Sequence, residues 1–330
     1  MDVTQTPANS VKGKLSNQTA GRKRKGKNTF NIAYGQPANN ITEDEVDASK
    51  SSISPKRSHQ VLLLLELATR ARDRRKLIRK VITDINGSSG QHPNSVEPAN
   101  PLPRAADQLS NPTFNYELPF PSVLAVVPNR FKVDGTTERN WPYMGRTKFK
   151  ELLEGLKKVR KSRCYNITLL YGTQGYGKSH LLAALVCYLA AQGERVVYIP
   201  DCRTWLQDPV GCVRAAMLFA WADDITTQKE IMTLNTEDEI ETFFMGQRNV
   251  IVVVDQLNAL TESSGSKKEM KERAKLHDWL MRFTFDHTAV FSSTADYQEY
   301  LEQSQDQTSN YVVRAYGGLD RVGHRKIVSQ

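Results

Sequence analysis

The sequence predicts an α/β domain in which helices cover both faces of a parallel sheet. Short apolar runs, typical of buried strands, alternate with longer helical segments through the second half of the chain. One run, 250–254, contains only valine and isoleucine, as expected for a strand buried on both faces. A glycine-rich turn joins another run, 166–171, to a helix that opens directly on it, which is the connection found in βαβ units.

The expected elements follow in chain order from the same patterns. A helix over 147–161 precedes the first strand, and further helices then alternate with strands. The expected strands are 166–171, 195–200, 250–255 and 288–293, and the later helices are 178–192, 209–222, 228–245 and 267–284.

The glycine-rich turn carries the first chemical motif. It matches the Walker A pattern G-x-x-x-x-G-K-[ST] between a strand and a helix, the context in which that pattern binds phosphate. The glycines let successive N–H groups point at phosphate oxygens, and the helix adds its positive end. We expect Lys178 to reach the β- and γ-phosphates and the Ser179 hydroxyl to ligate Mg²⁺. The predicted nucleotide-binding residues are Gly172, Thr173, Gln174, Gly175, Tyr176, Gly177, Lys178 and Ser179.

Asp255, at the carboxyl end of the 250–255 strand, completes a Walker B motif. Ligands gather at this edge of open parallel sheets, so we expect Asp255 to hold Mg²⁺, directly or through water. Gln256 follows where many related ATPases place a glutamate. An amide cannot accept a proton but can orient the attacking water, and Glu262 is an alternative base. Nucleotide binding is therefore predicted more strongly than rapid hydrolysis, and an ATPase activity stays open.

Other polar residues bear on the same site. Ser293 and Thr294 end the fourth strand, where they serve either as γ-phosphate sensors or as strand-end caps. Arg203 follows the second strand and either faces the site or lies on the surface. The Gly145-Arg146 turn either contacts adenine or only begins a helix. No Asn-Lys-x-Asp stretch of the kind that reads guanine is present, which favours ATP.

These motifs together predict a P-loop NTPase with the strand order 5-1-4-3-2. That order needs a fifth strand from the tail, for which 325–329 is the expected segment. ATPases of the AAA and STAND groups continue into a small helical lid, for which this sequence leaves no room. We therefore expect either a shortened product or a protein that binds nucleotide without the full machinery.

Four regions are expected along the chain. Residues 1–57 form a polar, disordered basic tail, 58–85 an amphipathic basic helix, 86–119 a linker and 120–330 the P-loop domain. The whole net charge of +9 lies within the first 86 residues. The run 22–27 is read either as a nuclear targeting signal, as a non-specific nucleic-acid contact or as a solvated tail.

The helix over 58–85 is expected to dock on the P-loop domain or on a partner, or less favourably to lie on a membrane surface. Its apolar run is too short to span a bilayer. No signal peptide follows Met1, and Cys164, Cys187, Cys202 and Cys212 lack zinc or redox spacing. These features indicate an intracellular protein with reduced thiols.

The chain resembles the P-loop NTPase region of Crinkler-type and retrotransposon-hot-spot-type proteins, over roughly 120–320. The resemblance rests on 172–179 with 181–186, 195–203, 222–224, 254–260 and 316–319. It implies an AAA/STAND-like ATPase in which the Asp255-Gln256 pair is a recurring feature of the family. Such proteins commonly carry a nuclease domain after the NTPase, and some act as effectors in a host nucleus. No nuclease-like region is seen before residue 330.

Three functions remain open from the sequence. The first is an ATP-binding, Mg²⁺-dependent NTPase that couples nucleotide state to a protein partner, with Lys178, Asp255 and Gln256 as catalytic residues. The second is a non-catalytic interaction protein with nucleotide as a structural ligand. The third is a nucleic-acid binder that uses residues 1–86.

Overall fold

The computed structural model describes residues 55–87, 102–123, 127–132, 140–162, 166–294 and 310–315. Its centre is a five-stranded sheet built from β3 (Ile167–Gly172), β4 (Arg195–Ile199), β5 (Val250–Val254), β6 (Thr288–Thr294) and β7 (Asn310–Ala315). The strands lie in the order β4-β5-β6-β3-β7, and every neighbouring pair is parallel. Read from the β7 edge and numbered in chain order, this is the predicted order 5-1-4-3-2, which is confirmed.

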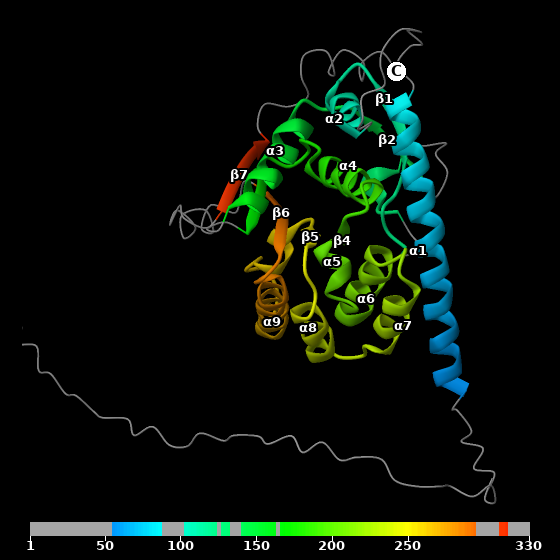
Figure 1. The fold of residues 1–330 in the computed structure, drawn as a ribbon. Helices are drawn as coiled ribbons and strands as arrows, with labels where there is room; N and C mark the ends of the chain where they lie inside the picture. The colour runs from blue at the N-terminus through cyan, green and yellow to red at the C-terminus, as the bar shows by residue number, and fades with distance from the viewer. Residues whose placement is uncertain are drawn as a thin grey trace, which may run out of the picture. The chain divides into compact units, whose positions relative to one another are not determined.

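Helices lie on both faces of the sheet, as expected (Figure 1). On one face lie α3 (Lys148–Lys161) and α4 (Lys178–Ala191). On the other lie α6 (Pro209–Ala220), α8 (Glu237–Met245) and α9 (Lys267–Thr284), with the shorter α5 (Cys202–Trp205) and α7 (Ile225–Thr233) nearby. The turn between β3 and α4 sits at the carboxyl edge of the sheet, as the Walker A pattern requires.

The single helix expected over 228–245 is two helices, α7 and α8. Thr236 interrupts it, because its side chain accepts a hydrogen bond from the Glu239 N–H while the Glu239 carboxylate bonds back to the Thr236 N–H. This capping box starts a new helix. Ser266 and Glu269 form the same box at the start of α9, whose predicted bounds match.

The fifth strand is formed by β7 and not by the expected segment 325–329, which lies outside the described residues. β7 pairs with β3 from Ile167 opposite Asn310 to Gly172 opposite Ala315. The approach is close at both ends of the contact. A side chain at Gly172 would meet the Ala315 carbonyl oxygen at 2.1 Å, and one at Gly155 of α3 would meet the Tyr311 ring at 2.5 Å. Glycine at both positions lets β7 lie against its neighbours.

The region before the sheet is more structured than predicted. The helix α1 spans Pro55–Gly87, longer than the expected 58–85. The expected linker 86–119 contains α2 (Leu102–Ser110) and β1 (Asn115–Pro119), and β1 pairs antiparallel with β2 (Asn140–Met144). This segment was predicted to be a linker because its elements are short and interrupted by prolines, so they show no clear helical or strand periodicity. The remaining residues of the predicted tail, with the basic run 22–27, lie outside the described residues.

The helix α1 belongs to the same compact unit as the sheet. It packs against α2, α4 and α6 through buried residues that include Ala68, Ala71, Ile78 and Ile82 (Figure 1). Every residue of α4 from Leu181 to Ala190 is buried, so this helix has no polar face to present to water. A helix that is apolar all round must be covered on all sides, and α1 supplies the outer cover. No described helix has the length and apolar character needed to cross a membrane.

Candidate functional site

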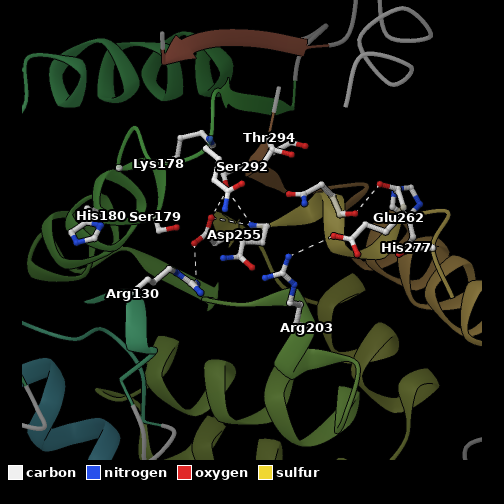
Figure 2. Close-up of a pocket in the computed structure, with 18 of the residues that line it drawn as sticks. Arg130, Lys178, Ser179, His180, Arg203, Asp255, Glu262, His277, Ser292 and Thr294 are labelled. Atoms are coloured by element: carbon white, nitrogen blue, oxygen red, sulfur yellow. Dashed lines mark hydrogen bonds and ion pairs between the residues drawn. The ribbon is translucent and has the colours of Figure 1, made fainter. Parts of the chain in front are cut away.

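Part of the phosphate loop lines a cavity of about 1170 Å³ at the carboxyl edge of the sheet (Figure 2). Gly175 and Gly177 adopt left-handed backbone angles, with φ of 85° and 72°, which glycine tolerates best. Gln174, Gly175, Gly177, Lys178 and Ser179 line the cavity. The other predicted loop residues, Gly172, Thr173 and Tyr176, form the turn without lining it.

Lys178 is the first residue of α4 and is 8% exposed. Its ammonium donates to two carbonyl oxygens of its own loop, those of Gly172 at 2.6 Å and Thr173 at 2.8 Å. Burial lowers the pKa of Lys178, and the charge of Asp255 partly opposes that shift. The ammonium is thus held at the loop, next to the N–H groups that the motif presents to phosphate.

Asp255 directly follows β5 and is 1% exposed. Its Oδ1 accepts hydrogen bonds from the Ser292 hydroxyl and from the Gln256 N–H at 3.0 Å, and the Ser179 hydroxyl also interacts with the carboxylate. Burial raises the pKa of Asp255, while Arg130 and the two hydroxyls act in the opposite direction. Ser179 and Asp255, predicted to share one cation, therefore lie side by side.

Arg130 was not predicted as a site residue from the sequence, and it lies in the 3₁₀ turn η1 (Asn129–Phe131). Its guanidinium bonds Asp201 at 2.9 Å and Asp255 at 3.2 Å, and it also donates to the Pro200 carbonyl oxygen. Burial alone would lower the pKa of Arg130, but the two carboxylates raise it above its usual value. Arg130 therefore contributes a permanent positive charge to the candidate site (Figure 2).

Gln256 has an unusual backbone and an occupied side chain. Its φ of 61° lies in the left-handed region, which is uncommon for a residue other than glycine. With the amide turned so that both atoms find partners, nitrogen donates to Asp201 Oδ1 at 3.2 Å and oxygen accepts from Arg130 Nη1 at 3.0 Å. The amide predicted to orient water is thus engaged by Asp201 and Arg130.

The remaining predicted residues also line the cavity. Ser293 is 1% exposed and lines the cavity, and its hydroxyl has no hydrogen-bond partner in the described part of the chain. A buried polar group left unpaired is costly, so a ligand atom is a natural partner for it. Thr294 also lines the cavity, and Arg203 lies 3.6 Å from Glu262 across its mouth. Arg203 therefore faces the cavity, although its side chain is largely exposed.

The Gly145-Arg146 turn lies against the backbone of the phosphate loop. Arg146 donates to the Tyr176 carbonyl oxygen at 3.3 Å, and a side chain at Gly177 would lie 2.2 Å from its guanidinium. Arg146 does not appear among the cavity-lining residues, so the structure gives it a place against the loop backbone. Gly145 is similarly confined, because a side chain there would meet the Asn111 carbonyl oxygen at 2.1 Å.

The oxygen donors at Ser179 and Asp255 fit Mg²⁺, which prefers hard oxygen ligands and is usually held by one or two protein groups together with substrate phosphates. Among the described residues, no cluster of three or more His, Cys, Asp or Glu side chains forms a metal site by itself.

Several residues that line the cavity or contact its lining were not identified from the sequence. Asp201 and Ser292 carried a usable signal, because each is a polar residue at the carboxyl end of an apolar strand. Arg130 and His277 carried none, since they lie outside any motif and only the fold brings them to the cavity, whereas His180 directly follows the Walker A serine and Asn258 lies in the 254–260 segment.

The strand order and the Walker A turn between β3 and α4 define a P-loop NTPase fold. No model of a known protein family matches the sequence, and no curated protein matches it. Two solved structures that resemble the chain are a DNA replication initiation factor and AMPPCP-bound DnaA from Aquifex aeolicus, each 18% identical. Their TM-scores are 0.33 and 0.32, and each match covers 55% of this chain and 48% of the other. This chain thus matches about half the length of either protein.

Proposed function

We propose that the protein is an ATP-binding, Mg²⁺-dependent P-loop NTPase. One observation carries the proposal, namely that a phosphate loop, a buried lysine and a hydroxyl–carboxylate pair surround a single cavity large enough for a nucleoside triphosphate. Lys178 and the loop N–H groups would hold the phosphates, and Ser179 and Asp255 would hold Mg²⁺, which neutralises phosphate charge when bound. The Ser293 hydroxyl, which has no hydrogen-bond partner among the described residues, supports a γ-phosphate contact.

Hydrolysis is expected to be slow. Gln256 can orient a water molecule but cannot take its proton, and its amide is already paired with Asp201 and Arg130. Glu262, the alternative base, is paired with Arg203. A partner that rearranges these pairs would accelerate hydrolysis, which would couple nucleotide state to protein binding.

Calorimetric titration with ATP and Mg²⁺ tests the proposal through Lys178→Ala. A charge-assisted hydrogen bond contributes about 1.5–3 kcal/mol, so losing contacts to two phosphates should weaken binding at least about a hundredfold. Lys275→Ala, on the exposed surface of α9, is the matched control and should bind like the wild type. Equal ATP affinity for both variants would reject the proposal.

The main alternative is a protein that binds nucleotide as a structural ligand. The occupied Gln256 amide favours it, because this side chain is the group predicted to orient the attacking water. Single-turnover release of phosphate from bound ATP separates the two functions. A structural binder shows no release above background, and ATP still raises its melting temperature by mass action.

A nucleic-acid contact is a second candidate function, favoured by a basic groove of about 430 Å³ along α1. Lys76, Arg79 and Lys80 are exposed on one side of the helix, where they could meet successive phosphates. Replacing the three by alanine should reduce the slope of log DNA affinity against log salt by about one for each residue replaced. Lys178→Ala should leave DNA affinity unchanged, and the reverse pattern would exclude this groove.

We also propose that the chain belongs with the Crinkler-type and retrotransposon-hot-spot-type proteins. The Asp255-Gln256 pair and the loop sequence support it, and an effector role in a host nucleus would follow from it. Nuclear accumulation of a fluorescent fusion tests the basic run 22–27. If replacing its lysines and arginines by alanine leaves the distribution unchanged, the targeting role is wrong.

A further inference from the structure

The carboxylate of Asp255 already has a full set of partners. A carboxylate offers about four acceptor positions. The Gln256 N–H and the Ser292 hydroxyl bond Oδ1, Arg130 bonds Oδ2, and the Ser179 hydroxyl interacts with the same group. A divalent cation that binds Asp255 must therefore displace one of these donors.

Of the four donors, Arg130 is the one that can yield. The Gln256 N–H belongs to the adjoining peptide, and Ser292 lies within β6, so both are fixed by the sheet. The Ser179 hydroxyl is itself a predicted cation ligand. Arg130 alone carries a positive charge that a cation would replace, and its side chain is a quarter exposed to the cavity.

Arg130 also has a second carboxylate partner besides Asp255. Its Nη1 is 2.9 Å from Asp201 Oδ2, and it donates to the Pro200 carbonyl oxygen. Its contact with Asp255, at 3.2 Å, is the longer of the two ion pairs. The guanidinium can therefore leave Asp255 and keep Asp201 as a partner, so displacement does not strand a buried charge.

We propose that Arg130 is a tethered cation that fills the divalent-cation position at Asp255 in the nucleotide-free protein, and that the metal competes with it. This proposal rests on the proposed nucleotide site and specifies which side chain occupies its cation position before the metal binds. The contact that the metal displaces is the one between Arg130 Nη2 and Asp255, while Nη1 keeps its bonds to Asp201 and to the Gln256 amide oxygen.

The test measures Mn²⁺ binding to the nucleotide-free full chain by electron paramagnetic resonance. Arg130→Gln removes the competing charge, and its affinity for Mn²⁺ should rise at least about tenfold over the wild type. Arg203→Gln is the matched control, because Arg203 lines the same cavity and pairs with Glu262 instead. It should bind Mn²⁺ as the wild type does. Asp255→Asn combined with Arg130→Gln should abolish the gain.

Arg130→Lys guards against a variant that fails to fold. Lysine keeps the charge but cannot span Asp201 and Asp255, so we expect a smaller rise in Mn²⁺ affinity. Unchanged Mn²⁺ affinity in both Arg130 variants, with circular dichroism showing folded protein, would overturn the competition. Calorimetry with ATP in EDTA separates the proposals, because a protein without a nucleotide site gives no ATP signal in any variant, whatever its Mn²⁺ affinity.

Discussion

Arg75 is expected to be the residue of α1 that matters most for stability. Its side chain is 4% exposed and fastens α1 to the rest of the fold. The guanidinium donates to carbonyl oxygens of Ala220 at 2.7 Å, Glu194 at 2.8 Å and Phe219 at 3.3 Å. Two of these carbonyls belong to the last turn of α6, where a positive charge also favours the helix dipole.

The cost of Arg75→Met follows from these contacts. Two short charge-assisted bonds contribute about 1.5–3 kcal/mol each, and methionine keeps most of the apolar stem. Burial lowers the pKa of Arg75, and its Nε has no partner among the described residues, so part of the gain is offset. We expect the free energy of unfolding to fall by about 3 kcal/mol.

Urea denaturation followed by circular dichroism measures this loss. Arg79→Met, one turn further along α1 and exposed, is the matched control and should change the unfolding free energy by less than about 0.5 kcal/mol. The m-value should stay constant, so that the shift in midpoint reports stability alone. If the two variants unfold at the same urea concentration, α1 does not dock through Arg75 and the reasoning fails.

Three further outcomes are expected. Gly155→Leu should destabilise the protein by about 1–3 kcal/mol in urea, because the added side chain must push Tyr311 and β7 away; no loss would contradict the close approach. Burial raises the pKa of the Cys187 and Cys202 thiols, so little thiolate forms, and iodoacetamide should label them only after denaturation, as judged by site-resolved mass spectrometry. Ser293→Ala should leave the urea midpoint unchanged or slightly raised, since its hydroxyl has no described protein partner, and should weaken ATP binding in calorimetry; a loss of stability would mean the hydroxyl serves the fold.

The sequence was sufficient for the sheet because its strands are strongly patterned. The run 250–254 can only be a covered strand, and the Walker A turn identifies the strand that leads into the phosphate loop. The fifth strand was assigned wrongly because 310–315 is short and flanked by polar residues. Its position depends on glycines at 155 and 172, whose role appears only when the backbones lie together.

The candidate site was predictable only where motif and strand end coincide. Ser179 and Asp255 could be placed next to each other because parallel strands deliver their carboxyl ends to one edge. Arg130 could not, because η1 lies outside the sheet and its reach to Asp255 depends on the path of the chain before β3. The backbone of Gln256 was also hidden, since nothing in the sequence marks a left-handed residue other than glycine.

The buried run Leu181–Ala190 of α4 has a practical consequence for anyone who expresses part of this protein. A fragment trimmed to the motif-bearing region from residue 120 would discard α1, α2 and β1, and would leave leucine and alanine side chains of α4 facing solvent. Such a patch favours self-association. The smallest well-behaved fragment should therefore begin before Pro55, well upstream of the first nucleotide-binding residue.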